Sequence, residues 1–430
     1  MQPAAQAALA QRVMPEGRLW ECRRPTAEFR DDRAPAGGHP TLERAVAELR
    51  TPDADTRVLG ADGLATLVAT LLHEGYRVVG PTVRDGAIVL DEIASSDELP
   101  HGWTAHHEAG SYRLEKRDDE AVFGWAVGPH LWKQELLPSH VRLWRASVAD
   151  GAAPTIDEEP PPERPLALLG ARSCDLHAIA IQDRVFLEGR YVERDYALRR
   201  QGAFVVAVNC GEPGGTCFCS SMGTGPRAEN GFDHAHTELV EGEHRFLVEA
   251  GSDRGRAILA ALPVREATAD DRSAAVSVTA EAEQRMGRQL ESAGLPELLA
   301  ANLDHPRFTE VAERCLTCGN CTLVCPTCFC TSVEDVNDLA DGSAERWRSW
   351  DSCFSTDYSH IHGGSVRRSP RARYRQWLTH KFGTWFEQFG TSGCVGCGRC
   401  ITWCPVGIDV TEELAAIRAA NGEVDHAHAR

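Results

Sequence analysis

One cysteine motif occurs twice in this chain, and it constrains the fold more than any other feature of the sequence. Residues 315–326 read CLTCGNCTLVCP and residues 394–405 read CVGCGRCITWCP, so both runs have the spacing C-x2-C-x2-C-x3-C-P. Cysteines spaced by two residues lie on a tight loop that can present three sulfurs to one face of a cube. Because thiolates are soft ligands that suit iron-sulfur chemistry, the motif predicts two [4Fe-4S] clusters.

The fourth cysteine of each run is expected to serve the cluster of the other run, as it does in two-cluster ferredoxins with this spacing. The first predicted cluster is therefore held by Cys315, Cys318, Cys321 and Cys404. The second predicted cluster is held by Cys394, Cys397, Cys400 and Cys325. Tetrahedral zinc is the alternative, but zinc sites usually pair two separated C-x2-C knuckles. The sequence offers no nucleophile with an accompanying base, so no catalytic residue is predicted.

A further group of four cysteines is predicted at one edge of a parallel sheet. The segment LALLGARSC is predicted as a buried strand that ends at Cys174, and AFVVAVNC as a second strand that ends at Cys210. A helix between them completes a β-α-β unit, whose neighbouring parallel strands end at the same edge. Cys217 and Cys219 follow in a glycine-rich loop, so the four sulfurs are expected to converge. We prefer a third iron-sulfur cluster, with a structural zinc or unliganded buried cysteines as alternatives.

The other four cysteines lack such spacing. Cys328, Cys330 and Cys353 are expected beside the clusters, with ligation of metal by some of them as the alternative, and Cys22 is expected to be a packing residue. Sixteen cysteines in a chain without a recognisable secretory signal are expected to bind metal, which predicts a cytoplasmic location. The formal net charge of -18 argues against a general nucleic-acid binder, and no apolar run is long enough for membrane insertion.

The predicted fold class is α+β, with an N-terminal mixed α/β region and a mostly helical C-terminal dicluster ferredoxin domain. Leucines at helical spacing in 61–76, followed by a strand hairpin, support the first part, whereas 332–350 and 371–390 are compatible with helices. The expected division is 1–150 as an N-terminal α/β domain, 151–265 as a β-α-β domain, 266–300 as a helical connector, 301–422 as the two-cluster domain and 423–430 as a tail.

A basic segment lies between the two motifs. From Arg346 to Lys381, seven Arg and one Lys stand against Asp351 and Asp357, which gives a local formal charge of +6. These cations either balance the negative clusters or form a docking surface for an acidic partner. The sequence leaves both alternatives open.

From about Tyr76 to Pro405, the chain resembles the β subunit of cytoplasmic NADP-linked [NiFe] hydrogenases, also called sulfhydrogenases. The same dicluster family includes the A subunit of anaerobic sulfite reductase. The resemblance is carried by CLTCGNCTLVCPTCFC, RWRSWDSCFSTDYSHIHGGSVR, GARSCDLHAIAIQDRVFL and NCGEPGGTCFCSSMGTGP.

This resemblance implies an electron-transfer subunit without substrate chemistry of its own. It would relay single electrons between a [NiFe] hydrogenase centre and a flavin subunit that handles NAD(P). The implied partners are the small and large hydrogenase subunits and that flavin-containing subunit. The alternatives are a subunit of an anaerobic sulfite or sulfur reductase, which would need a sirohaem partner, and an iron-sulfur sensor, for which no DNA-reading module is recognisable.

Overall fold

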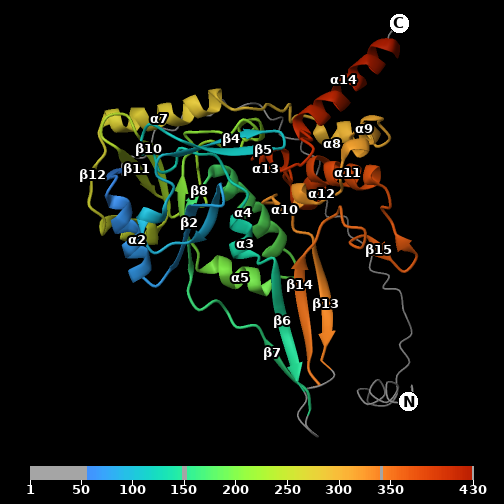
Figure 1. Ribbon diagram of the computed structural model, residues 1–430, viewed down its shortest axis with the longest axis horizontal. Coiled ribbons are helices and arrows are strands. Elements are labelled where there is room, and N and C mark those ends of the chain that lie inside the picture. Colours follow the sequence, from blue (N-terminus) through green and yellow to red (C-terminus); the bar gives the residue numbers. More distant parts are fainter. Residues whose placement is uncertain (1–55, 148–152, 339–341, 429–430) are drawn as a thin grey trace, which may run out of the picture. The chain divides into compact units, whose positions relative to one another are not determined.

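An eight-stranded mixed sheet organises the first part of the chain in this computed structural model, which describes residues 56–147, 153–338 and 342–428. Its strands are β1 (Arg57–Gly60), β2 (Arg77–Arg84), β3 (Ala87–Glu92), β8 (Leu166–Ala171), β9 (Phe204–Val208), β10 (His234–Leu239), β11 (Arg245–Ala250) and β12 (Val264–Glu266). Their order is β12-β1-β11-β10-β9-β8-β2-β3, and Figure 1 labels β12, β11, β10, β8 and β2. The central pairs β2 with β8, β8 with β9 and β9 with β10 are parallel, and the outer pairs are antiparallel.

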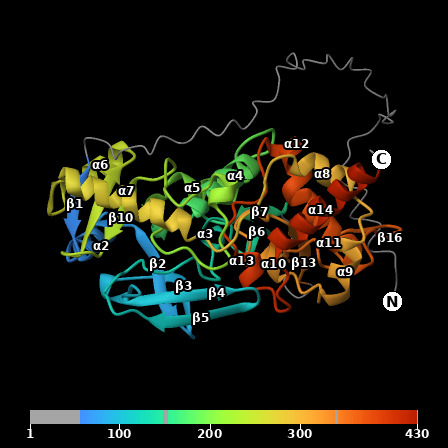
Figure 2. The ribbon, with the colours of Figure 1, turned by 90° about the horizontal axis from the view of Figure 1, so that it is seen from above.

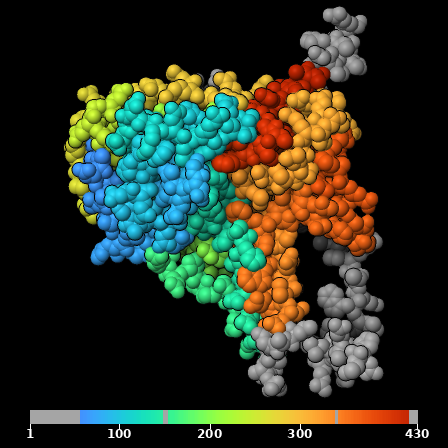
Figure 3. Space-filling model, in the orientation of Figure 1, coloured from blue at the N-terminus to red at the C-terminus, as the bar shows by residue number. Residues whose placement is uncertain are grey.

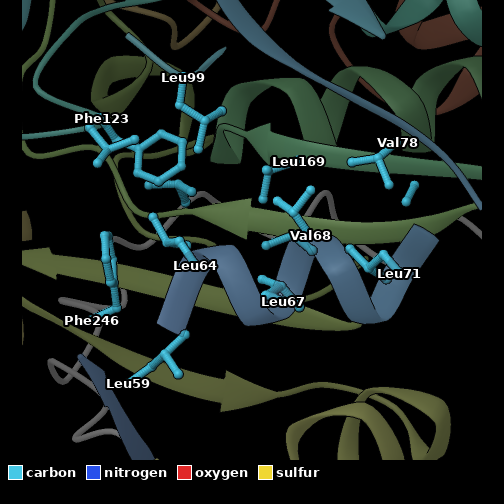
Figure 4. Packing of buried hydrophobic residues seen from close by; sticks show 14 of the residues in the cluster. Leu59, Leu64, Leu67, Val68, Leu71, Val78, Leu99, Phe123, Leu169 and Phe246 are labelled. Atoms are coloured by element: carbon cyan, nitrogen blue, oxygen red, sulfur yellow. The ribbon is translucent and has the colours of Figure 1, made fainter. Parts of the chain in front are cut away.

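The predicted β-α-β unit is confirmed, because α4 (Ser173–Phe186) connects the parallel strands β8 and β9. Both strands are buried along their whole length, as expected for strands covered on two faces. Alternate residues of β8 and β9 enter two different cores. One core contains α2 (Gly63–His73), which confirms the helix predicted in 61–76, and Figure 4 shows its Leu64 and Leu71 together with Leu169 and Phe246.

Shorter elements surround this sheet. They are η1 (Ser96–Glu98), β4 (Trp103–Glu108), β5 (Ser111–Lys116), α3 (Trp132–Leu136), α5 (Arg194–Gln201), η2 (Ser220–Met222), α6 (Asp253–Ala260) and α7 (Ala269–Gln284). The strands β4 and β5 form a separate antiparallel hairpin, and Figure 2 shows the two strands side by side. The predicted helical connector contains α7, whose first turn is capped by the Thr268 side chain.

A second sheet of four strands joins distant parts of the sequence. Its strands are β6 (His140–Ser147), β7 (Thr155–Glu158), β13 (Thr331–Asn337) and β14 (Ala344–Trp350), in the order β13-β14-β6-β7. The prediction of helix in 332–350 was therefore wrong, since this segment forms the β13-β14 hairpin that Figure 3 shows at the surface. Its charged residues suit a helix locally, but β14 gains a strand partner from β6, about two hundred residues earlier, which outweighs that preference.

The rest of the C-terminal part is mostly helical, which confirms the predicted fold class. Its elements are α8 (Leu295–Ala301), α9 (Arg307–Arg314), α10 (Asn320–Leu323), β15 (His360–Ile361), β16 (Gly364–Ser365), α11 (Pro370–Thr379), the π-helical turn η3 (His380–Thr384), α12 (Trp385–Phe389), α13 (Arg399–Thr402) and α14 (Val410–His428). Helix α14 continues into the segment that was expected to be a tail. A core of aromatic and aliphatic side chains, among them Phe308, Trp377 and Leu414, holds the helices together.

The division into domains stays a prediction. The eight-stranded sheet takes strands from both sides of residue 150, and β6 and β7 extend the sheet of the β13-β14 hairpin. The prediction for Cys22 concerns a residue that lies outside the described part of the chain. Across the described ranges, no helix combines the length and the apolar character needed to span a bilayer.

Candidate metal centre

The two cysteine motifs adopt the same local structure. Each contains a glycine in the left-handed region, Gly319 with φ of 78° and Gly398 with φ of 72°, directly before a single helical turn. Each also points a backbone N-H at its first sulfur, from Thr317 to Cys315 Sγ at 3.5 Å and from Gly396 to Cys394 Sγ at 3.4 Å. The shared spacing therefore produces two loops that curl around their own cysteines, which is the geometry a cubane requires.

The four cysteines of the first prediction, here called the first thiol set, lie together. Burial raises the pKa of Cys321, and the neighbouring thiols of Cys315, Cys404 and Cys318 raise it further. Cys404 thus reaches this set from the other motif. The set lines a pocket whose empty space, together with its open mouth, is about 470 Å³.

The first pocket contains hydrogen-bond donors without acceptors. Tyr374 and Trp377 line it and are buried, at 3% and 5% exposure. Within the described residues, neither Tyr374 Oη nor Trp377 Nε1 has a hydrogen-bond partner. Unpaired buried donors cost free energy, and sulfide or thiolate sulfur would accept from them. The residues present therefore fit an iron-sulfur cluster.

The four cysteines of the second prediction, the second thiol set, also lie together. Burial raises the pKa of Cys400, followed by the effects of Cys394, Cys397 and Cys325. Cys325 thus reaches this set from the first motif. Cys321 also affects the pKa of Cys400, so the first and second thiol sets lie next to each other.

Single-metal geometry is not found in these sets. Among residues 56–147, 153–338 and 342–428, no three His, Cys, Asp or Glu side chains are placed as ligands of one metal ion. A tetrahedral zinc site needs its sulfurs within about 3.8 Å of one another, since each lies about 2.3 Å from the metal. A cubane binds its thiolates through different irons and holds them further apart. The preference for clusters over zinc rests on the motif spacing, because zinc sites usually pair two separated C-x2-C knuckles.

The middle cysteines form a third thiol set, as the sheet topology predicts. Cys174 lies in the first turn of α4 and Cys210 follows β9, both at the carboxyl edge of the parallel strands. Burial raises the pKa of Cys219, followed by the effects of Cys217, Cys210 and Cys397. Burial also raises the pKa of Cys174, with smaller effects from Asp175 and then Cys219 and Cys397, so Cys174 joins this set through Cys219, beside the second thiol set.

The loop that carries the third set is in direct contact with the second motif. Cys217 Sγ donates to the carbonyl of Cys397 at 3.7 Å, and the N-H of Phe218 donates to the carbonyl of Gly396 at 2.8 Å. A Cβ atom at Gly396 would lie 2.6 Å from the Phe218 carbonyl oxygen. This close approach explains why a glycine is needed there.

Two buried lysines lie beside the second thiol set. Lys381 Nζ donates to Cys325 Sγ at 3.2 Å and to the carbonyl of Gly393 at 2.9 Å. Lys133 Nζ donates to the carbonyls of Cys325 and Cys328, both at 3.0 Å, and stacks over Trp350. Burial opposes the charge of Lys381, yet Cys325 and Cys328 hold its pKa above the usual value. Burial lowers the pKa of Lys133.

A buried arginine lies beside both the second and the third thiol sets. Arg399 Nη2 pairs with Asp175 at 3.0 Å, and its Nε donates to the carbonyl of Gly128. Despite its burial, Asp175 and then Cys397 and Cys174 raise the pKa of Arg399. Sequence reasoning missed all three cations. Lysine is rare in this chain, with Lys116, Lys133 and Lys381 as its full complement, and that rarity was an available signal.

The basic segment between the motifs is partly balanced by nearby groups. Arg346 pairs with Asp335, and both Arg371 and Arg375 pair with Asp304. Arg348 pairs with Glu193 and Asp195. Arg373 donates to backbone carbonyls, and Lys381 donates to Cys325 Sγ. Arg367 and Arg368 bond to the Ser359 hydroxyl and the Ser365 carbonyl, which carry no charge. Part of the segment is therefore balanced by carboxylates, and both alternatives stay open.

The comparisons with known proteins agree with this geometry. A family described as a 4Fe-4S dicluster domain matches residues 314–408, the region of both motifs. The sulfhydrogenase 2 subunit beta of Pyrococcus furiosus is 34% identical over 259 residues, which cover 58% of this chain and 73% of the relative. No solved structure matches the chain significantly. The resemblance found in the sequence is confirmed, and the chain belongs to the family of hydrogenase β-type iron-sulfur subunits, which serve in electron transfer.

Proposed function

We propose that the chain relays single electrons between a [NiFe] hydrogenase centre and a flavin-containing subunit that handles NAD(P). The observation that carries this proposal is the contact between successive thiol sets. Cys321 of the first set affects the pKa of Cys400 of the second set. Cys397 of the second set affects the pKa of Cys219 of the third set. A relay needs redox groups in short steps, and this order provides them.

The proposal assigns a [4Fe-4S] cluster to each of the first two thiol sets and a third cluster to the middle set. Membership of Cys404 in the first set and of Cys325 in the second supports cross-ligation between the motifs. Each cluster, when bound, accepts and gives up one electron. The third assignment is supported by four adjacent thiols at one sheet edge, none of them in a disulfide.

The chain's own side chains would bind the clusters, shield them from water and set their charge environment. Tyr374 and Trp377 offer donors to the first cluster, whereas Lys381 offers an ammonium to the second. Arg399 lies between the second and third positions. Donors and cations near a cluster favour its reduced, more negative state.

The first thiol set is the best candidate for the end at which a partner exchanges electrons. Cys318 is exposed, and the neighbouring Leu316 and Leu323 are 60% and 41% exposed. Exposed apolar side chains around a redox group suit a protein partner. We infer that this face meets another subunit of the complex.

Anaerobic co-purification tests the proposed function. Affinity-tagged chain should carry with it the small and large subunits of a [NiFe] hydrogenase and a flavin-containing subunit, and hydrogen should bleach the cluster absorbance of that complex. The chain purified alone should show neither hydrogen uptake nor NAD(P)H oxidation. Recovery of a sirohaem-containing partner in place of the hydrogenase subunits would support the sulfite reductase alternative and overturn the proposal.

A further inference from the structure

Two cysteines outside the three thiol sets are in contact with each other. Cys330 directly precedes β13 and Cys353 follows β14, and the two strands pair with Thr331 opposite Trp350. The backbone N-H of Asp351 donates to the carbonyl of Cys330 at 2.8 Å, which continues the ladder past the strand ends. The thiols of Cys330 and Cys353 hydrogen bond to each other. The hairpin thus holds this thiol pair in a fixed relation.

The thiol pair lies near both the first and the second thiol sets. Cys321 of the first set affects the pKa of Cys353. Cys330 affects the pKa of Cys328, and Cys328 hydrogen bonds to Cys325 of the second set. Both thiols are half-buried, so neither is sealed in the core nor fully open to solvent.

The groups around the pair suit thiol chemistry. The Lys381 ammonium acts electrostatically on both sulfurs and would stabilise a thiolate. The Tyr358 hydroxyl hydrogen bonds to Cys330, and Tyr358 is 37% exposed, so it connects the pair to solvent. The two thiols are in hydrogen-bond contact, and a disulfide requires them to approach to about 2.05 Å.

We propose that Cys330 and Cys353 form a reversible disulfide that exchanges an electron pair with the neighbouring clusters. On oxidation, two S-H bonds break and one S-S bond forms. The two electrons pass singly to two oxidised clusters, held by the first and second thiol sets, and the two protons leave to solvent on the Tyr358 side. Reduction is the reverse. The inference rests on the proposed function, because the clusters are the electron acceptors.

This thiol pair would connect two-electron reactions to one-electron transfer. Hydrogen and NAD(P) are two-electron couples, whereas each cluster carries one electron at a time. A dithiol stores two electrons at one site and can release them one after the other to separate clusters. The inference therefore assigns the chain a two-electron store beside its one-electron relay.

Peptide mapping of the iron-loaded full chain tests the disulfide. The protein is equilibrated anaerobically in dithiothreitol buffers of graded redox poise, its free thiols are alkylated, and the peptides are identified by mass spectrometry. A peptide linking Cys330 to Cys353 should appear as the poise becomes oxidising and vanish on reduction, with bound iron unchanged. Absence of this linked peptide at every poise that keeps iron bound would overturn the proposal.

Electron counting tests the link to the clusters. Reductive titration of the oxidised protein should consume about two electrons per chain more in wild type than in Cys353→Ser, since the disulfide is a two-electron couple. Val333→Ala, an exposed change in the same hairpin, should keep both the linked peptide and the extra electrons. If the linked peptide forms but electron uptake equals that of Cys353→Ser, the coupling is refuted.

Failure of the inference can be told from failure of the proposed function. Clusters that are reduced by the hydrogenase complex without any linked peptide would refute the thiol pair and leave the relay standing. A linked peptide in a chain whose clusters never accept electrons from the complex would refute the relay, and with it the assigned electron acceptors.

Discussion

Replacement of the buried Lys381 by methionine should lower the reduction potential of the cluster that Cys325 is proposed to bind. Lys381 is 3% exposed, and its ammonium lies 3.2 Å from Cys325 Sγ. At an effective dielectric constant of about 20, a unit charge at 3.2 Å contributes about 5 kcal/mol. The added electron is spread over a cluster and is about twice as far away on average, which leaves about 2.6 kcal/mol, or roughly 110 mV.

The assay is a redox titration followed by electron paramagnetic resonance, with iron and labile sulfide measured on every sample. We expect the potential of one cluster to fall by about 100 mV in Lys381→Met and to return towards the wild-type value in Lys381→Arg, which restores the charge. Lys116→Met is the matched control, because Lys116 is exposed and screened by solvent. A potential within about 20 mV of wild type, in a variant that keeps its iron, would refute the electrostatic argument.

Three further outcomes follow from the thiol sets. Cys404→Ser should alter the resonance spectrum of the cluster held by the first motif, and an altered spectrum of the other cluster would contradict cross-ligation. Iron analysis should give about twelve iron per wild-type chain and about eight in Cys219→Ser, whereas about eight in both would remove the third cluster. Tyr374→Phe, which deletes an unpaired buried donor, should lower the potential of the first cluster by tens of millivolts in a redox titration, and an unchanged potential would show that its hydroxyl does not face the cluster.

The candidate site was predictable where its residues are specified by spacing or by strand pattern. The interval between cysteines fixes a loop, so the two motif loops follow from the sequence, whereas the exchange of Cys325 and Cys404 between clusters stays a prediction. Continuous apolar runs specify buried parallel strands, and their ends then place Cys174 and Cys210 at the same edge of the sheet. In these cases the structure is determined by residues close together in the sequence, or by the rule that neighbouring parallel strands end at the same edge of a sheet.

The parts that were not predictable depend on partners far away in the sequence. Residues 332–350 contain Glu334 and Asp335, which disfavour strands, and their hairpin is explained only by its pairing with β6. The contact between Cys330 and Cys353 follows from that hairpin and could not be found without it. Neither residue has a spacing that indicates a pair.

The buried cations show that the N-terminal region contributes to the cluster environment. Lys133 is carried by α3, yet its ammonium binds the carbonyls of Cys325 and Cys328, and Gln182 of α4 donates to the carbonyl of Pro326 at 3.2 Å. A buried cation without a nearby anion costs several kcal/mol, and burial alone lowers the pKa of Lys133, so negative charge on the nearby cysteines stabilises its charged form. The ferredoxin motifs and the α/β region therefore depend on each other electrostatically: the clusters offset the cost of burying the cations, and the cations offset the charge of the clusters.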